Sequence, residues 1–178
     1  MQNFHRLAVG INVEGVKLQL HLHPELWNMH QDRKNAPGSP HAGMSDIWVR
    51  WREKERGELP FMPAWLPAWH SLAALRPIVF GLMSAVNATF LGGVLITRIP
   101  PGGVILPHND RGTWHAEYMN VKLYVPIASN SSCVNVCESE TVVMGEGEAW
   151  YFDNLREHSV ENHGDTERIT LIVCMRVE

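Results

Sequence analysis

The sequence predicts a mainly β protein of the β-sandwich or jelly-roll class, with a few helices in its N-terminal half. First, short apolar runs follow one another closely from residue 91 onward, separated by Gly, Pro, Asn and Asp residues that favour turns. Second, the length of 178 residues allows one domain to bury a core without disulfides. Third, the composition of 45% apolar and 19% charged residues is typical of a soluble globular protein.

The beginning of the chain predicts a hairpin followed by a loop. Apolar and polar residues alternate over residues 7–13 and again over residues 16–22. Because Glu14 and Gly15 join these stretches, the pattern favours a β-hairpin. Residues 35–43, which read Asn-Ala-Pro-Gly-Ser-Pro-His-Ala-Gly, are rich in turn formers and are expected to form a loop.

The next part of the chain predicts one strand, an irregular connector and one long helix. Residues 46–51 alternate again and are expected to form a strand. Residues 71–87 are the best helix candidate, in which Pro77 either opens the second half or produces a kink. Between them lies a tryptophan-rich connector in which three prolines are expected to exclude regular structure: Pro60, Pro63 and Pro67.

We expect one domain over residues 1–178, in which residues 1–90 flank a core formed by residues 91–178. Both halves of that core carry short apolar runs, which are separated by turn residues. The predicted core strands are residues 94–99, 104–106, 119–125, 133–137, 141–144, 149–152, 158–161 and 168–177.

Charge and hydropathy exclude two classes of partner. The formal net charge of −4 offers no broad basic surface, so we expect no nucleic-acid partner. Polar or small residues interrupt the longest apolar run, residues 77–91, so we expect no membrane span. The N-terminus lacks the apolar region of a signal peptide, and we therefore expect a cytoplasmic protein.

The three cysteines are expected to be buried free thiols. Their odd number argues against a disulfide framework, and Cys133 and Cys137 have the alternating apolar neighbours of strand residues. A zinc site would need more ligands at closer spacing than these two and Cys174 offer.

Two histidines and an aspartate have the composition of a metal site. His108 and Asp110 follow an apolar run and a proline, and His158 lies 50 residues later. Two imidazoles and one carboxylate form the facial triad of non-haem Fe(II) oxygenases, which leaves coordination positions open for oxygen chemistry. The alternatives are a turn in which Asp110 caps a backbone amide, and His163 in place of His158 as the distal ligand.

Arg168 is the candidate anchor for an anionic co-substrate. Along residues 168–174, Arg168 and Thr170 alternate with apolar residues, so both faces of this strand are expected to be buried. A buried guanidinium needs a partner, and a carboxylate can accept two parallel hydrogen bonds from it. The distal carboxylate of 2-oxoglutarate is one such partner, and an internal Glu or Asp is the alternative.

Three segments carry a resemblance to a known family. LITRIPPGGVILPH (95–108), GEGEAWYFDNLREHSV (145–160) and ERITLIV (167–173) resemble the aspartyl/asparaginyl β-hydroxylase family. The resemblance implies a double-stranded β-helix, that is, a cupin-like jelly roll. The animal hydroxylase of that family has glycine where this chain has Asp110, so the chain is more similar to small bacterial and phage-type members with a complete triad.

The same resemblance assigns roles to individual residues. It implies iron at His108 and His158, and 2-oxoglutarate held by Arg168 and by the hydroxyl of Thr97. A further 2-oxoglutarate contact in the family falls near Asn120, or at Lys122 if the register slips, and we favour Asn120. Thr170 is the remaining candidate 2-oxoglutarate contact.

The expected function is an Fe(II)- and 2-oxoglutarate-dependent hydroxylase. Such an enzyme uses O2 and converts 2-oxoglutarate to succinate and CO2 while it hydroxylates an amino acid, or an Asp or Asn residue of a peptide or protein. One alternative is a cupin-like metal dioxygenase or isomerase that does not use 2-oxoglutarate, and another is a non-catalytic jelly roll that binds a sugar or a peptide.

The substrate contacts are the least defined part of the sequence. His41 lies in the proline-rich loop, and Arg50 is expected to share a face of the strand after it with Trp48. Trp114 and His115 follow the first metal motif. Each is expected to line the substrate pocket or to be a plain surface or packing residue. His21 and His23 share one face of the predicted second strand, and we interpret that face as solvated.

Overall fold

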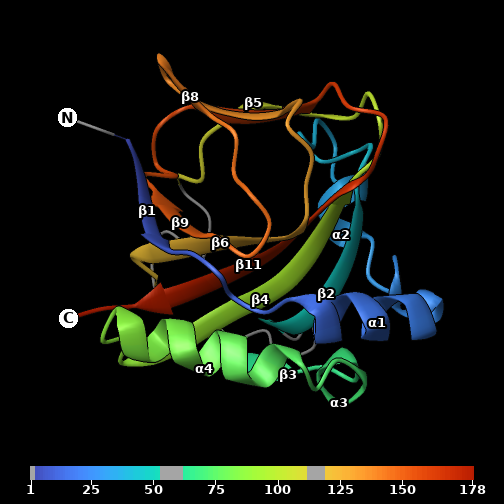
Figure 1. The fold of residues 1–178 in the computed structure, drawn as a ribbon, viewed down its shortest axis with the longest axis vertical. Coiled ribbons are helices and arrows are strands. Elements are labelled where there is room, and N and C mark those ends of the chain that lie inside the picture. Colours follow the sequence, from blue (N-terminus) through green and yellow to red (C-terminus); the bar gives the residue numbers. More distant parts are fainter. Residues whose placement is uncertain (1–2, 53–61, 112–118) are drawn as a thin grey trace.

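A computed structural model describes residues 3–52, 62–111 and 119–178 of the chain. Two antiparallel β-sheets face each other, and helices cover the outer face of the larger sheet (Figure 1). This arrangement confirms the predicted mainly β jelly roll with helices in the N-terminal half.

The larger sheet has seven strands and runs through the middle of the molecule (Figure 1). Its long central strand, β11 (Arg168–Arg176), carries Leu171 and Val173 on the face toward the helices. Ile172 and Cys174 lie on its other face, toward the smaller sheet. Both faces are therefore buried, as the alternation predicts. In spatial order the strands are β1 (Phe4–Ala8), β9 (Ala149–Phe152), β6 (Val121–Ala128), β11 (Arg168–Arg176), β4 (Phe90–Ile99), β2 (Ser45–Arg52) and β3 (Pro63–Trp65).

The smaller sheet has four strands and lies above the larger sheet in Figure 1. In spatial order its strands are β5 (Val104–His108), β10 (His158–Asn162), β7 (Cys133–Cys137) and β8 (Glu140–Val142). Three of the strands of the larger sheet come from residues 1–90, so the predicted flanking segment completes the sheet of the core. The division at residue 90 stays a prediction.

The helices that contribute to the core pack below the larger sheet (Figure 1), whereas the short helix at residues 32–35 has no buried residue. The predicted long helix is confirmed, although it begins at Leu75, which places Pro77 in the first turn where a missing N–H breaks no helical hydrogen bond. No helix of the described residues is long and apolar enough to cross a membrane. The helices are α1 (Glu14–Leu22), the 3-10 helix η1 (Pro24–Leu26), α2 (Asp32–Asn35), α3 (Ala68–Ser71) and α4 (Leu75–Ala85).

The predicted N-terminal hairpin is wrong, because its second half is helix α1. Val16 and Leu20 are buried, four residues apart, whereas Leu18 and Leu22 are about 60% exposed. This spacing places one apolar stripe against the core and follows the helical period of 3.6 rather than the strand period of 2. The side chain of Asn12 also accepts a hydrogen bond from the backbone N–H of Glu14 at the start of the helix.

The connector after β2 is more regular than its prolines predict. Pro63 begins β3, an edge strand of the larger sheet, where a missing N–H costs no ladder hydrogen bond. Pro67 precedes α3, a position that tolerates proline for the same reason. Pro60 lies outside the described residues.

The core is divided by the larger sheet. One apolar cluster fills the space between that sheet and the helices, and a second lies between the two sheets. Cys133, Cys137 and Cys174 are buried free thiols, as predicted. The functional residues described below lie on the second side, between the sheets.

Candidate metal centre and co-substrate cavity

The two predicted histidine ligands face each other across the smaller sheet. His108 ends β5 and His158 begins β10, and the antiparallel register pairs these two residues directly. Their ring centroids are 4.3 Å apart. Strand pairing therefore brings together two histidines that are separated by 49 residues in the sequence.

Asp110 completes the candidate metal centre. It follows β5 by two residues, and its backbone N–H donates to the carbonyl of Asn154 at 3.0 Å. Its Oδ1 lies 3.9 Å from Nε2 of His108. Ligand atoms of His108, Asp110 and His158 all lie within 4.8 Å of one another, close enough for all three to bind one metal ion.

Backbone contacts fix which nitrogen of each histidine faces the centre. Nδ1 of His108 donates to the carbonyl of Leu106 at 2.7 Å, and Nδ1 of His158 donates to the carbonyl of Arg156 at 2.9 Å. A carbonyl only accepts, so Nε2 of each ring keeps its lone pair for a metal. Burial lowers the pKa of both imidazoles, that of His158 to about 4, and both rings are neutral at pH 7.

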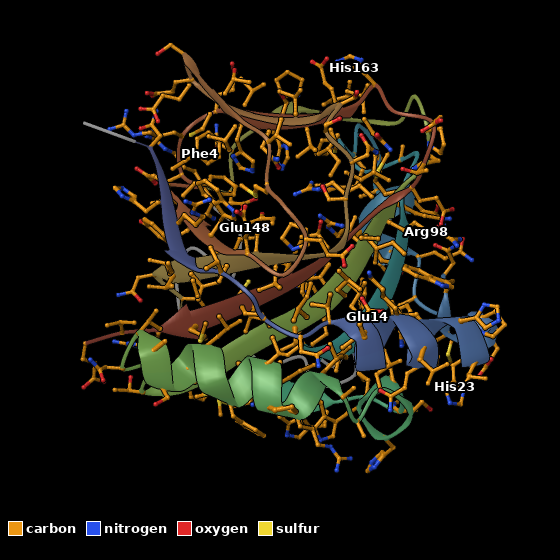
Figure 2. All side chains as sticks on the ribbon, in the orientation of Figure 1. Phe4, Glu14, His23, Arg98, Glu148 and His163 are labelled. Atoms are coloured by element: carbon orange, nitrogen blue, oxygen red, sulfur yellow. The ribbon has the colours of Figure 1, made fainter. Side chains whose placement is uncertain are left out.

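The competing histidines lie elsewhere. The side chain of His163 is 61% exposed and contacts Glu161 at 2.9 Å, just beyond the end of β10 opposite His158 (Figure 2). His23 lies at the end of α1 and contacts Glu25, and His21 is exposed on the same helix. Within the described residues, His108, Asp110 and His158 are the only group of three side chains close enough to share an ion.

Lys122 and Asn154 bind the second oxygen of Asp110. Nζ of Lys122 donates to Oδ2 at 2.6 Å, and Nδ2 of Asn154 donates to the same atom at 2.7 Å. Burial alone would raise the pKa of Asp110, but the Lys122 ammonium and these two hydrogen bonds outweigh it and hold that pKa well below its usual range. Asp110 is therefore a carboxylate at neutral pH.

Of the two residues offered as the further co-substrate contact, only Lys122 lies in the cavity wall. Asn120 lies before the start of β6 and is exposed, and its side chain exchanges two hydrogen bonds with the backbone of Val177. The preference for Asn120 is therefore corrected to the alternative, Lys122. Asn120 lies one residue before β6, and its side chain bonds to the backbone near the chain end, so it does not point into the cavity.

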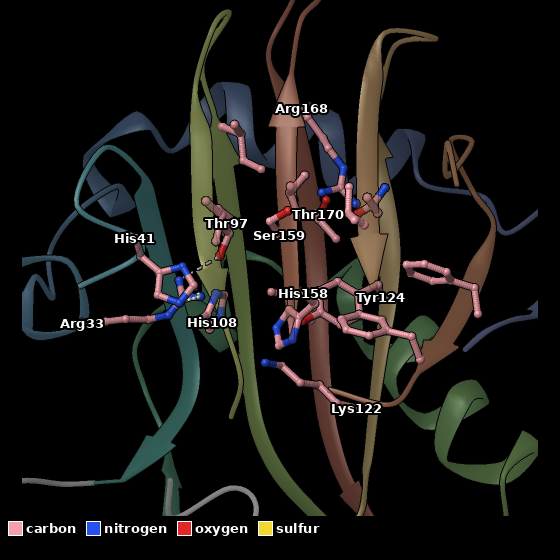
Figure 3. A pocket seen from close by; sticks show the side chains of 18 residues that line it. Arg33, His41, Thr97, His108, Lys122, Tyr124, His158, Ser159, Arg168 and Thr170 are labelled. Carbon is pink, nitrogen blue, oxygen red and sulfur yellow. Dashed lines mark hydrogen bonds between the residues drawn. The ribbon is translucent and has the colours of Figure 1, made fainter. Parts of the chain in front are cut away.

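A narrow cavity extends from the metal centre between the two sheets. Figure 3 shows Arg168 and Thr170 at one end and His108, His158 and Lys122 at the other. The cavity has a volume of about 30 Å³ and an apolar wall. That wall includes Phe4, Ile99, Ile105, Tyr124, Val136, Phe152, Val160 and Ile172.

The far end of this cavity contains polar atoms without partners. Arg168 is 2% exposed and Thr170 is 3% exposed. Among the described residues, Nε of Arg168 and Oγ1 of Thr170 have no hydrogen-bond partner, and Nη2 of Arg168 contacts only the sulfur of Met144, at 3.7 Å. No internal carboxylate of the described chain pairs with this guanidinium, so its charge faces the cavity without a counter-ion from the described residues.

Thr97 lies in the same cavity but has partners in the protein. Its Oγ1 donates to Oδ1 of the buried Asp46 at 2.8 Å and accepts from Arg33 at 3.3 Å. Arg33 also pairs with the carboxylate of Asp46 at 2.9 Å and contacts the ring of His41 at 3.0 Å. Arg33 thus joins α2 and the proline-rich loop to β2 and β4.

His41 lies beside the metal centre, as its proposed role in substrate binding requires. Its ring lies edge-on to His108 at 4.9 Å. Burial lowers the pKa of His41, and the nearby Arg33 charge lowers it further, so this ring is neutral at pH 7. Together with Arg33, His108 and Lys122, it separates the cavity from a wider groove outside.

The outer groove has a volume of about 580 Å³. The loop from Ala36 to His41 lines one side, and Trp48, Trp51 and Leu95 line another. Sequence reasoning missed Arg33, Trp48 and Trp51. The sequence offered one signal for the groove: Trp48 and Trp51 lie close together on the strand that follows the turn-rich loop.

Arg50 does not contribute to this groove. Its Nε donates to the carbonyl of Leu91 at 3.2 Å, and its guanidinium lies 4.8 Å from the ring centroid of Trp65. The prediction that it shares a face with Trp48 is wrong, because a register shift in β2 between these residues breaks the alternation. The other two predicted substrate contacts, Trp114 and His115, lie outside the described residues.

Comparisons with known proteins agree with this fold and site. Residues 22–177 match the family described as aspartyl/asparaginyl beta-hydroxylase. Over 78 residues, the chain is 30% identical to an L-proline cis-4-hydroxylase from Rhizobium meliloti (strain 1021). That alignment covers 44% of this chain and 27% of the relative, so the matched region is about a quarter of the relative's length.

Solved structures share the fold at low sequence identity. A prolyl hydroxylase from Trichoplax adhaerens, in complex with a hypoxia inducible factor peptide fragment, has a TM-score of 0.65 and 15% identity over 98% of this chain and 83% of that chain. A viral collagen prolyl hydroxylase from Paramecium Bursaria Chlorella virus-1, solved with 2-oxoglutarate, has a TM-score of 0.56 and 10% identity over 99% and 97%. A 2OG-Fe(II) oxygenase family oxidoreductase from Burkholderia pseudomallei has a TM-score of 0.55 and 14% identity over 75% and 67%.

These three likenesses support the jelly-roll fold alone. The family match is stronger, because it runs from the end of α1 to the last residues of β11 and so includes every strand of both sheets except β1. It also includes the three motifs whose resemblance to this family the sequence shows. The chain belongs to the aspartyl/asparaginyl β-hydroxylase family.

Proposed function

We propose that the protein is an Fe(II)- and 2-oxoglutarate-dependent hydroxylase, in which His108, Asp110 and His158 hold the iron. Two neutral imidazoles and one carboxylate are the ligand set of non-haem Fe(II) oxygenases. The close approach of these three ligands and the neutral state of both rings support the assignment.

The unpartnered guanidinium of Arg168 is the observation that carries the co-substrate assignment. A buried charge without a partner is costly, and a carboxylate can satisfy it with two charge-assisted hydrogen bonds. Thr170 offers an additional donor beside it. A diacid such as 2-oxoglutarate would place one carboxylate at Arg168 and the other at the metal end of the same cavity.

The cavity must widen to accept such a molecule. Its volume of about 30 Å³ is room for only one or two water molecules. The long side chains of Met144 and Arg168, which contact each other at the closed end, are able to separate when an anion binds. We therefore expect 2-oxoglutarate binding to replace the sulfur contact of Arg168.

Each group of residues then has a distinct task. When bound, iron(II) with 2-oxoglutarate and O2 supplies an oxidant that hydroxylates an unactivated C–H bond, with release of succinate and CO2. The apolar walls between the sheets exclude water from the cavity. Arg168 and Thr170 orient the co-substrate, and backbone carbonyls orient the two histidine rings.

The outer groove is the proposed substrate site. It opens beside His108 and Asp110 and is lined by the loop that carries His41 and by Trp48 and Trp51. Two of the similar proteins are described as a proline hydroxylase and as a prolyl hydroxylase bound to a peptide. We infer that the substrate is an amino acid or a residue of a peptide or protein, and proline, Asp and Asn are the candidates.

An anaerobic titration tests this function. Fe(II) and 2-oxoglutarate added together are expected to produce a weak visible charge-transfer band that neither addition produces alone. A metal enzyme that does not use 2-oxoglutarate would bind Fe(II) without the band, and a non-catalytic jelly roll would bind neither. A screen for succinate release over amino acids and peptides, with mass detection of a product heavier by one oxygen atom, would then identify the substrate.

A further inference from the structure

The two oxygens of Asp110 have different surroundings. Oδ2 accepts hydrogen bonds from Lys122 and from Asn154, at 2.6 and 2.7 Å. Oδ1 lies on the side of His108, 3.9 Å from its Nε2. One oxygen is therefore directed to the metal centre, and the other is held by two donors from different parts of the chain.

Both donors are fixed by the fold. Lys122 lies on β6 of the larger sheet, its side chain is 14% exposed, and its ammonium lies 5.7 Å from the ring centroid of Tyr124. Asn154 follows β9, and its carbonyl accepts the backbone N–H of Asp110 at 3.0 Å. Lys122 therefore reaches from the larger sheet to a carboxylate that follows β5 of the smaller sheet.

We propose that Lys122, together with Asn154, is a positioning residue that holds Asp110 as a ligand through one oxygen only. This inference rests on the proposed function. A carboxylate can bind a metal through one oxygen or through both. With one oxygen from Asp110 and one nitrogen from each histidine, an octahedral ion keeps three open positions, which a chelating 2-oxo acid and O2 require together. A second carboxylate oxygen would occupy one of them.

The positive charge of Lys122 also favours co-substrate binding over a second bond between Asp110 and the metal. An ammonium in the cavity wall repels a divalent cation but attracts a dianionic co-substrate. Replacing Lys122 with an uncharged residue would remove this repulsion and release Oδ2 toward the metal. We therefore expect co-substrate affinity to fall while metal affinity stays the same or rises. Loss of an ion pair with only a structural role would not separate the two affinities in this way.

The test compares Lys122→Met with wild-type protein loaded with Mn²⁺ in the absence of 2-oxoglutarate. Water-proton relaxation measures the number of exchangeable water molecules on the bound ion, and we expect three in the wild type and two in Lys122→Met. We further expect 2-oxoglutarate affinity to fall about tenfold or more, while Mn²⁺ affinity is unchanged or higher. Lys17→Met is the matched control, because Lys17 pairs with Glu14 and Glu146 on the surface, far from this site.

Asn154→Ala provides an uncharged second variant. It removes the hydrogen bond from Asn154 to Oδ2 without changing the charge, so we expect a smaller fall in 2-oxoglutarate affinity with no gain in Mn²⁺ affinity. If Lys122→Met does not fold, this variant decides: two exchangeable waters, or a mixture of two and three, support the inference, and a count of three with wild-type 2-oxoglutarate affinity overturns it.

Three outcomes separate this inference from the proposed function. Lys122→Met with three waters and wild-type 2-oxoglutarate affinity would overturn the inference alone. A fall in Mn²⁺ affinity and melting temperature with no change in water count would also overturn it, because Lys122 would then be only a counter-ion. Wild-type protein that takes up no Mn²⁺ would overturn the proposed function and this inference with it.

Discussion

His158 and His163 lie five residues apart, yet only His158 faces the candidate metal centre. We predict that His158→Ala lowers Fe(II) affinity by more than about 100-fold, since removal of a direct ligand should exceed the 10- to 100-fold loss typical of outer partners. His163→Ala should keep wild-type affinity. Equilibrium dialysis measures both, with melting curves as a control for folding. Loss of iron in His163→Ala alone would contradict the assignment of the distal ligand.

The order of motifs along the chain was enough to predict that the candidate triad residues lie close together; the role of Arg168 stays a proposal. His108, His158 and Arg168 each end or begin a strand that the alternation pattern also marks, so their meeting follows from sheet pairing. The role of Lys122 could not be assigned in the same way. Its partner Asp110 lies in an irregular segment, and no periodicity fixes the distance between a strand residue and a loop.

Local irregularities explain the misplaced residues. A register shift in β2 turns Arg50 away from the face of Trp48, and such bulges have no reliable signature in a single sequence. Asn120 lies just before β6, where the chain end rather than a neighbouring strand supplies its partners. Strand boundaries are the least certain part of a sequence-based assignment, and here one boundary decides which residue faces the cavity.

At the scale of elements, helix α1 is the clearest departure from the sequence-based prediction. Leu20 is buried and Leu18 is 60% exposed, although in a strand the two would share one face. We predict that Leu20→Ala lowers the free energy of unfolding by about 2–5 kcal/mol, the usual cost of a buried Leu→Ala change. Leu18→Ala should change it by less than about 0.5 kcal/mol.

Urea denaturation of the two variants provides the comparison. Equal destabilisation by both substitutions would show that residues 16–22 pack as a strand and would contradict the helical assignment. The sequence left this open because apolar residues at positions 16, 18, 20 and 22 fit a strand, whereas positions 16 and 20 also fit a helix. Tertiary burial against α4 and the larger sheet selects the helix.

The elements after residue 90 were easier to predict. Their turns contain Gly, Pro and Asn residues at nearly every strand end, such as Gly102, which has a φ of +70° in the turn between β4 and β5. At position 147, a turn residue other than glycine would not fit. Gly147 has a φ of +69°, and an added Cβ would lie 2.5 Å from the carbonyl oxygen of Ile11.

At the scale of the whole molecule, the site joins the two sheets. His108 and His158 belong to the smaller sheet, whereas Lys122 and Arg168 belong to the larger one. Any change in how the sheets face each other therefore moves the candidate metal ligands relative to Arg168, the proposed co-substrate anchor. The jelly-roll class could be predicted because the spacing of turns is a local property of the sequence. The cavity could not be predicted, because its shape depends on how the two sheets face each other.

Buried histidines should make the stability of the metal-free protein depend on pH. Burial lowers the pKa of His41, His108 and His158 below the unfolded value of about 6.5, and that of His158 is about 4. Between these values the unfolded chain binds more protons than the folded chain, so stability falls as pH falls from about 6.5 to about 4. We expect a loss on the order of a few kcal/mol.

Urea denaturation of metal-free protein at several pH values measures this dependence. In His158→Gln the fall should be shallower, because one of the buried titrating groups is absent. In His163→Gln, which replaces an exposed histidine, the profile should match the wild type. A wild-type free energy of unfolding that stays constant from pH 7 to pH 4.5 would contradict the burial of these rings.

We propose that the cavity between the sheets binds 2-oxoglutarate through Arg168, and titration of the Arg168→Lys variant with 2-oxoglutarate is the test of this proposal. Lysine keeps the charge but loses the two-pronged geometry. Loss of one charge-assisted hydrogen bond of about 1.5 to 3 kcal/mol should weaken 2-oxoglutarate binding roughly tenfold to over a hundredfold. Iron affinity without co-substrate should stay at the wild-type value, because Arg168 is not a ligand. Unchanged 2-oxoglutarate affinity, with or without a fall in melting temperature, would contradict the account.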